Sequence, residues 1–418
     1  MSRVLRLVHV ADVHLDTPFR ARSEAVRARL AEAVWTALER AVELARAEDC
    51  DALLLAGDVF DSERVTAATE ARLVSLLAGL AEDGIAVALA TGNHDPGGED
   101  GRLGALAGRD GVALFDRGEP RTVVLRDRGG RVVGHLVGVG HDSPHESASL
   151  AARFPGRPGP EPTVGLMHAL VVGARGSERH DRYAPCTLRE LAAFDGDYWA
   201  LGHVHTRQAV SDDPVAWYPG NLQGRHFGET GARGALIVEV TAGGGAEVAF
   251  APLAPVRWEE VVLSDLAAVA RAPELAARAA EAFAALRGDD ADGVEDWMLR
   301  LVLRGVCPLE EELRDEGARR DLERVLAREL GALELEIDAS GLLAPHDYDA
   351  LAARDDLLGA ALRDLGDRRR AEDPLAELAL DRLASRAARE DPRGLLEGVE
   401  ALVVEALVVE ALRPGGAR

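Results

Sequence analysis

Seven polar side chains, each at the end of an apolar segment, form a set of possible metal ligands. They are Asp12, His14, Asp58, Asn93, His168, His203 and His205. A hydrophobic core does not tolerate a lone charge, so a carboxylate at the end of a buried strand has to meet cations or water. Oxygen and imidazole donors without a thiolate favour Mn2+, Fe2+ or Zn2+ over Ca2+ or Mg2+. Seven donors are too many for one tetrahedral ion and suit a pair of divalent cations.

A pair of divalent cations that shares a bridging carboxylate points to one kind of chemistry. Such ions, about 3.5 to 4 Å apart, serve in-line displacement at phosphorus. One ion lowers the pKa of a bound water, and both stabilise the charge that grows on the phosphoryl oxygens. Each element alone is weak evidence, because Gly-Asp is common in turns and a lone histidine is more often structural. Their joint occurrence in this order predicts phosphoester hydrolysis.

The elements that would position the first ligands alternate between strand and helix. The pattern predicts strands at Val4–Val10, Ala52–Ala56 and Ile85–Ala90, and helices at Ser23–Glu48 and Glu63–Asp83. Parallel strands joined by helices end at one edge of a sheet, which is where open α/β sheets bind ligands. Residues two apart in an extended strand share a face, so we expect Asp12 and His14 to point the same way.

The remaining ligands follow later strands. Short strands with Gly-Gly turns are predicted at Val112–Phe115, Thr122–Arg126 and Val132–Val139, and favour a more antiparallel region. Strands at Thr163–Met167 and Tyr198–Leu201 then lead into His168 and into the Gly-His-Val-His sequence at 202–205. Imidazoles therefore also arrive from strand ends.

The length of the chain predicts more than one domain, because 418 residues exceed what one core usually fills. We expect a catalytic domain at 1–254, a small α/β accessory module at 255–345 and a helical tail at 346–418. The tail ends in a repeat of Glu-Ala-Leu-Val-Val that starts at Glu400. Five residues advance a helix by about 140°, which spreads apolar groups around its axis. This favours contact with a partner or a second copy over packing on the chain's own core.

The charge of the chain argues against simple nucleic-acid binding. Arginine supplies all 48 basic residues against 72 acidic ones, for a net charge of -24, whereas nucleic-acid affinity comes mainly from phosphate neutralisation. The excess is denser after residue 250, with 22 Arg against 37 acids there and 26 against 35 before it. Two bound cations would offset part of the N-terminal charge. A polyanionic substrate therefore remains compatible with a metal-bearing face.

The sequence also bears on where the protein resides. The sequence shows neither a signal-peptide core nor an uncharged apolar run of membrane-spanning length. We therefore expect a cytoplasmic protein without membrane association. Three widely spaced cysteines without a Cys-x-x-Cys pair indicate reduced thiols, and argue against a disulfide framework and against a zinc site built from thiolates.

The order of the motifs resembles the calcineurin-like metallophosphoesterase superfamily. It reads Asp-x-His, Gly-Asp-x-x-Asp, Gly-Asn-His-Asp, His, and Gly-His-x-His. The longer sequences ADVHLDTPF at 11–19 and YPGNLQGRH at 218–226 are similar to SbcD-type DNA repair exonucleases, in their YhaO-like branch. The resemblance covers about residues 1–250 and is more specific for the superfamily than for the substrate.

The resemblance implies a four-layer α/β/β/α sandwich and a role for each ligand. Asp58 would bridge two cations; Asp12, His14 and His205 would complete one site, and Asn93, His168 and His203 the other. His94 would steady the phosphate or protonate the leaving oxygen, with Asp95 orienting it. His94 as an eighth ligand remains the alternative.

The activity implied by the resemblance is that of a Mn2+-dependent DNA exo/endonuclease in repair, paired with a coiled-coil ATPase that docks on the tail. A homodimer is a further possibility. Arg225 and His226 are candidate substrate contacts. Two other functions compete: a phosphoesterase for small nucleotides or phosphoproteins, and a non-enzymatic subunit that organises an ATPase assembly around a structural metal cluster. Digestion of DNA that is lost in a His94→Ala variant would separate the nuclease from the phosphoesterase, and an Asp58→Asn variant that loses catalysis but keeps partner binding would decide against the scaffolding subunit.

Overall fold

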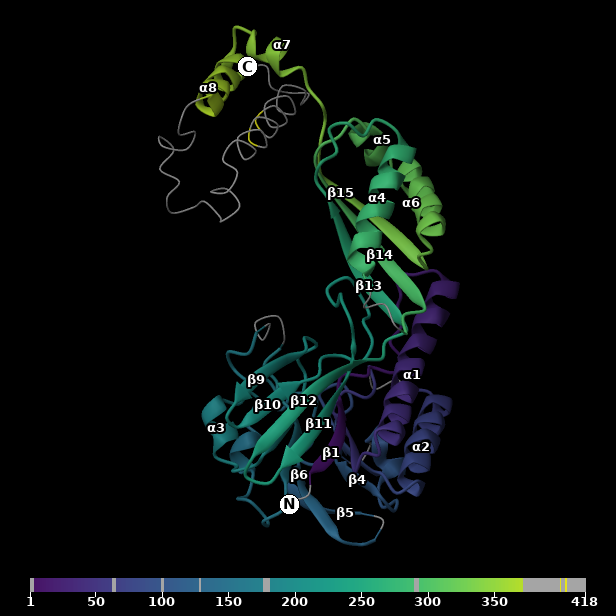
Figure 1. Cartoon of the computed structure of the whole chain (residues 1–418), viewed down its shortest axis with the longest axis vertical. Coiled ribbons are helices and arrows are strands. Elements are labelled where there is room, and N and C mark those ends of the chain that lie inside the picture. The colour runs from purple at the N-terminus through teal and green to yellow at the C-terminus, as the bar shows by residue number, and fades with distance from the viewer. Residues whose placement is uncertain are drawn as a thin grey trace. The chain divides into compact units, whose positions relative to one another are not determined.

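A computed structural model describes residues 4–61, 65–98, 101–127, 129–175, 181–288, 293–370, 399 and 403 (Figure 1). The chain divides into two compact units. Unit 1 comprises Met1–Glu259 and Asp292–Trp297, and unit 2 comprises Glu260–Ala291 and Met298–Arg418. The predicted boundaries after residues 254 and 345 stay predictions.

The first sheet of unit 1 has the order β12-β11-β1-β2-β3-β4. Its strands are β1 (Leu5–Val10), β2 (Ala52–Ala56), β3 (Ala86–Ala90), β4 (Val112–Phe115), β11 (Gly234–Thr241) and β12 (Gly245–Pro252). Strands β1 to β4 are parallel, β11 runs antiparallel to β1, and β12 antiparallel to β11. The carboxyl ends of β1, β2 and β3 therefore meet at one edge.

Two helices, α1 (Glu24–Ala47) and α2 (Ala67–Glu82), pack on the outer face of this sheet (Figure 1). A side-chain cap begins each, because Ser23 accepts from the amide of Val26 and Thr66 accepts from that of Thr69. A short 3-10 helix, η1 (Arg102–Leu106), lies against α2. The first strand-helix units thus form as the sequence predicts: β2 has the predicted bounds, and the ends of the other elements shift by at most four residues.

The second sheet of unit 1 has the order β5-β6-β7-β8-β10-β9. Its strands are β5 (Arg121–Arg126), β6 (Val132–Gly138), β7 (Thr163–His168), β8 (Tyr198–Gly202), β9 (Gln208–Asp212) and β10 (Val215–Tyr218). Only the β5–β6 hairpin of the predicted antiparallel region is antiparallel. Strand β4 extends the first sheet and β6 pairs in parallel with β7, because the chain crosses between sheets after β4.

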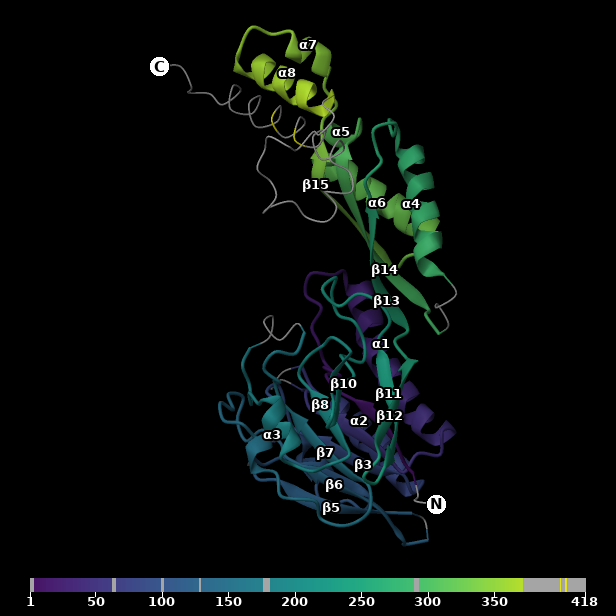
Figure 2. The same cartoon turned by 60° about the vertical axis from the view of Figure 1, so that its left-hand side comes forward.

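The main core lies between the two sheets. Alternate residues such as Leu54 of β2 and Leu166 of β7 enter it, and a buried hydrogen bond of 2.9 Å joins His9 Nδ1 to the hydroxyl of Tyr198 within it. Trp199 of β8 faces the other way and packs near α3 (Leu188–Ala192) and η2 (Ala151–Arg153). The predicted four-layer α/β/β/α sandwich is confirmed (Figure 2).

Unit 2 contains a three-stranded sheet in the order β13-β14-β15, with helices. The strands are β13 (Val256–Leu263), β14 (Asp296–Val306) and β15 (Glu334–Leu343), of which β13 and β14 begin within unit 1. The helices are α4 (Ala272–Arg287), α5 (Glu310–Arg314), α6 (Glu316–Leu330), α7 (Tyr348–Ala352) and α8 (Leu357–Arg370). The five-residue repeat of the tail lies outside the described residues, apart from Val403. Across the described ranges, no helix is both long and apolar enough to cross a bilayer.

Candidate metal centre

The backbone after the strands of unit 1 turns into left-handed conformations. The φ angle is 51° at Asp12, 53° at His14, 51° at Asp58 and 107° at His203. Our prediction that strand alternation aligns Asp12 with His14 is wrong in its reason, because β1 ends at Val10. Their amides instead donate to the carbonyls of Gly57 and Asp58, at 3.1 and 3.0 Å. These turns aim the side chains into one space, a form of strain common at functional sites.

Glycines allow the strand ends to approach one another. A Cβ atom on Gly92 would lie 2.2 Å from Asp58 Oδ1, and one on Gly202 would lie 1.7 Å from the carbonyl oxygen of Ala56. Both distances are far below van der Waals contact. The Gly-Asn-His and Gly-His-x-His motifs therefore begin with glycine for a steric reason.

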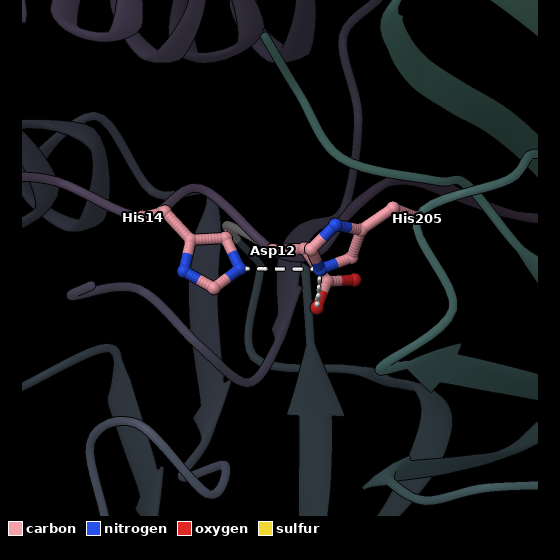
Figure 3. Close-up of side chains that lie close together, drawn as sticks. All are labelled: Asp12, His14 and His205. Atoms are coloured by element: carbon pink, nitrogen blue, oxygen red, sulfur yellow. Dashed lines mark hydrogen bonds and ion pairs between the residues drawn. The ribbon is translucent and has the colours of Figure 1, made fainter. Parts of the chain in front are cut away.

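Asp12, His14 and His205 converge on one side of the site, which we call half A (Figure 3). His14 Nε2 lies 3.3 Å from His205 Nε2, and His205 Nε2 lies 3.6 Å from Asp12 Oδ1. Two imidazole nitrogens that face each other repel through their lone pairs unless a cation or proton lies between them. A divalent cation held by these three groups satisfies all of them.

Asp58 occupies the centre of the site and is only 2% exposed. Its Oδ2 lies 4.0 Å from His14 Nε2 and 3.4 Å from His168 Nε2, so the carboxylate faces ligands of both predicted cations. Burial alone would raise the pKa of Asp58, but the charge and hydrogen bond of His168 hold it well below its usual value. A buried ionised carboxylate at this place suits a bridging ligand.

Asn93, His168 and His203 form the other side, half B. His168 Nδ1 lies 2.9 Å from the carbonyl of Ala56, to which it donates, and this directs Nε2 to Asn93 Oδ1 at 3.1 Å. The ring of His203 lies edge-on to that of His168, with centroids 5.1 Å apart. The structure thus brings all seven predicted ligands together, while their roles as ligands stay predictions.

His94 and Asp95 are placed differently from one another. His94 Nδ1 lies 2.6 Å from the carbonyl oxygen of Asp61, and the ring lines the same pocket as the ligands. Asp95 accepts hydrogen bonds from the amides of Val59, at 2.6 Å, and Gly92, at 2.7 Å. Asp95 therefore fixes the loops that carry Asp58 and His94, whereas the His94 ring is oriented by a carbonyl. His94 also lies within reach of His14 and Asp58, so both its predicted roles remain compatible with this geometry.

Two further acidic residues belong to the site and were assigned no role from the sequence. Glu229, 3% exposed, lies 2.7 Å from His205 Nδ1. Asp61 lies 3.3 Å from His14 Nδ1. Asp61 is the last residue of the Gly-Asp-x-x-Asp motif, so a signal for it existed. Glu229 follows no apolar strand and gave no such signal.

The two predicted substrate residues lie beside these acids. Arg225 contacts Asp61, Glu229 and His205, and only 13% of its side chain is exposed. His226 is 61% exposed and lies 3.4 Å from Glu229. The structure therefore leaves His226 accessible and surrounds Arg225 with protein groups. Substrate contact by either stays a prediction.

A pocket of about 430 Å³ opens at the site. Its lining residues are Asp58, Asn93, His94, Pro144, His145, Asp181, Tyr183, His203 and His205. Burial lowers the pKa of His168 and of His205, but the charges and hydrogen bonds of nearby carboxylates outweigh it and raise both to about 9. Positive charge is therefore favoured where two carboxylates meet, which again fits divalent cations.

Comparisons with known proteins show what the chain is similar to. Residues 5–207 match the model of the calcineurin-like phosphoesterase family. The chain is 29% identical to the DNA double-strand break repair protein Mre11 of Methanopyrus kandleri over 266 residues, which are 59% of this chain and 56% of that protein. A dimetal phosphatase structure from Danio rerio aligns with 12% identity and a TM-score of 0.34, over 59% of this chain and 98% of the other.

A curated relative from Bacillus subtilis extends the match beyond the family model. The uncharacterized metallophosphoesterase YhaO is 32% identical over 308 residues, which cover 73% of this chain and 72% of the relative. The resemblance inferred from the motifs is thereby confirmed. On this evidence the chain belongs to the calcineurin-like metallophosphoesterase family and is a metal-dependent hydrolase.

Proposed function

We propose that this protein is a DNA exo/endonuclease of DNA repair that uses two divalent cations, in the first place Mn2+. The observation that carries the proposal is that Asp12, His14, His168 and His205 gather with the buried Asp58, while Asn93 and His203 lie against His168. The relative named as a DNA double-strand break repair protein supports DNA as the substrate. The mixed donor set supports Mn2+, with Fe2+ or Zn2+ as alternatives.

The residues around the site have distinct tasks in hydrolysis. When bound, the cations supply hydroxide near neutral pH and stabilise charge on the phosphoryl group. The Asp58 and Asp12 carboxylates stay ionised, and the His168 ring turns Nε2 inward because Nδ1 donates to Ala56. His94 Nδ1 donates to the carbonyl of Asp61, so the ring acts as a general acid in its imidazolium form, in which Nε2 carries the proton that passes to the leaving oxygen.

The charge around the pocket makes the cations essential for affinity as well as for chemistry. None of the described residues that line the pocket is an arginine, and Asp181 adds a carboxylate to it. A polyanionic backbone is therefore attracted mainly by the cations themselves. We expect DNA binding to fall sharply when a chelator removes them.

The test uses purified protein with defined linear duplex and single-stranded DNA, at several ionic strengths, with Mn2+, Mg2+, Fe2+ or Zn2+. A small aryl phosphodiester is assayed in parallel. We expect DNA digestion with Mn2+, and its loss in His94→Ala. Turnover of the small diester without cleavage of any DNA would instead favour a phosphoesterase for small nucleotides or phosphoproteins. Membership of a hydrolase family speaks against the purely scaffolding alternative.

Partners form the second part of the proposal. A coiled-coil ATPase would dock on the helical tail, or two copies of the chain would pair there; the spread of apolar residues in the tail sequence supports both. We further propose a cytoplasmic location. Light scattering and copurification of the full chain, with and without the last 19 residues, check the tail's part.

A further inference from the structure

We propose that Asp61, Arg225 and Glu229 form a positioning ring that holds His14 and His205 in place, and so pre-forms half A for its cation. This inference rests on the binuclear function proposed above. It assigns to Arg225 a task within the protein instead of a contact with the substrate.

The ring is a closed series of contacts. His14 Nδ1 lies 3.3 Å from Asp61 Oδ1, and the same oxygen accepts from Arg225 at 3.0 Å. The guanidinium also donates to Glu229 Oε1 at 3.1 Å. That oxygen accepts from His205 Nδ1 at 2.7 Å. The Nε2 atoms of the two histidines, 3.3 Å apart, close the ring.

Glu229 accepts a hydrogen bond from His205 Nδ1 at 2.7 Å and so fixes a proton on that nitrogen of the imidazole. The Asp61 carboxylate lies 3.3 Å from His14 Nδ1, where its negative charge favours a proton on the same nitrogen. An imidazole that donates from Nδ1 presents the Nε2 lone pair to a metal, and the carboxylate makes that nitrogen more basic. In half A both Nε2 atoms face inward with Asp12. The ring therefore favours the tautomers that a cation needs.

Glu229 is fixed on both of its oxygens. Oε2 accepts from Asn221 Nδ2 and from the backbone amide of Arg225, each at 2.8 Å. Asn221 Oδ1 in turn accepts from Arg233 at 2.6 Å, and Arg233 also donates to the carbonyl of His205. The carboxylate is thus held by the fold before any ligand arrives.

Arg225 allows the carboxylates of Asp61 and Glu229 to lie close together beside half A. Its guanidinium lies between Asp61 and Glu229 and neutralises charge that would otherwise repel. A guanidinium engaged on both sides by carboxylates is poorly placed to bind a phosphate. The buried position, with 13% of the side chain exposed, agrees with this role.

The experiment measures Mn2+ binding to the full chain by calorimetry, and the spin-coupled Mn2+ pair by electron paramagnetic resonance. We expect two ions in the wild type. Glu229→Ala should weaken one of them by about 10- to 100-fold and leave the other within about twofold, with Glu229→Gln in between. Activity should return at high Mn2+ concentration.

The control is Asp197→Asn, which removes another buried carboxylate paired with an arginine. Asp197 lies 2.7 Å from Arg157 and belongs to none of the contacts of the ring. It should destabilise the protein without changing either Mn2+ affinity. Equal weakening of both ions in Glu229→Ala, or no weakening in a folded variant, would overturn the ring proposal. A wild type that fails to bind two ions refutes the binuclear function itself.

Arg225→Leu separates positioning from substrate contact. A positioning role predicts weaker Mn2+ binding at one site and a KM that is unchanged at saturating Mn2+. A substrate contact predicts unchanged Mn2+ binding with a raised KM, and that result would remove Arg225 from the ring.

Discussion

Half A and half B of the metal centre hold their histidines by different means. In half A the outer nitrogens of His14 and His205 face the side chains of Asp61 and Glu229. In half B, His168 and His203 face backbone carbonyls, those of Ala56 and Asp181. Half A therefore depends on a few replaceable side chains, whereas half B depends on the fold. Mutations should show this difference as unequal loss of the two cations.

Substitution of Asp58, which faces both halves, should cause the largest loss of activity. The Asp58 carboxylate faces a histidine of each half, so under the proposed bridging role Asp58→Asn should weaken the binding of both cations. Activity should fall by about 10³-fold or more, equivalent to roughly 4 kcal/mol of lost transition-state stabilisation. Steady-state kinetics and metal analysis of the folded variant check this. Activity within tenfold of the wild type would contradict a bridging role.

Half B should be disrupted by a substitution at a backbone position that lies close to His168. Gly57 has a φ angle of 86°, and a Cβ atom there would lie 2.4 Å from His168 Nδ1. Gly57→Ala should displace His168, lower the free energy of unfolding by about 1 to 3 kcal/mol and weaken the half B cation. Denaturant unfolding and Mn2+ titration measure both effects.

Gly173→Ala is the matched control for that substitution. Gly173 also has a positive φ angle, of 92°, but among the described residues, its chain neighbours aside, no atom lies within 4 Å of the Cβ position. It carries the backbone strain without the collision. If both variants bind Mn2+ equally well, the close approach to His168 is not what matters.

A pair of alanine substitutions compares the halves directly. Asp61→Ala removes the carboxylate that faces His14, so one Mn2+ should bind about 10- to 100-fold more weakly. Asp181→Ala keeps the carbonyl that faces His203 at 2.9 Å, so Mn2+ affinity should stay within about twofold. Calorimetric titration of each variant with Mn2+ measures both affinities. Equal losses would erase the distinction between the halves.

The smallest effect concerns pH and the metal-free protein. The pKa values of His168 and His205, raised to about 9, give stability that is complete below pH 6.5 and lost as pH rises toward 9. Burial lowers the pKa of His14 to about 4 and of His203 to about 3. The folded protein therefore keeps these two imidazoles neutral, and the stability that depends on this is lost as pH falls below 6.5. In EDTA the melting temperature should therefore peak near pH 6.5.

Mn2+ should remove the alkaline decline, because bound cations hold both imidazoles deprotonated. Each kcal/mol lost in EDTA corresponds to roughly 2 to 4 °C of melting temperature. Calorimetric scans at pH 5.5, 6.5 and 8.5, with and without Mn2+, give the comparison. A melting temperature in EDTA that keeps rising to pH 8.5 would contradict these protonation states.

The sequence indicated which residues lie together at the candidate site, because apolar strands end where these polar residues begin. The runs that lead to Asp58 and to His168 are of this kind; they form β2 of the first sheet and β7 of the second, each paired in parallel with a neighbouring strand. It failed for Glu229, which lies in a loop and becomes part of the site only through contacts made after folding. No local pattern marks such a residue.

The pairing of strands was harder to predict than their existence. β4 lies next to β5 in sequence, yet the two belong to different sheets. Short apolar strands carry no information about which partner they meet. The alignment of Asp12 with His14 was predicted for the wrong reason, since left-handed backbone and not strand alternation produces it. The sequence therefore indicates which side chains are available to the site, but it does not reveal the backbone conformation that orients them.

That backbone conformation limits how far the motif can be transplanted. Four of the seven predicted ligands, namely Asp12, His14, Asp58 and His203, have positive φ angles, which non-glycine residues seldom adopt. Copying the same side chains onto the strand ends of another α/β scaffold would reproduce the donor atoms but would not orient them toward one centre. An engineered hydrolase built on this arrangement has to inherit the glycines and turns along with the ligands.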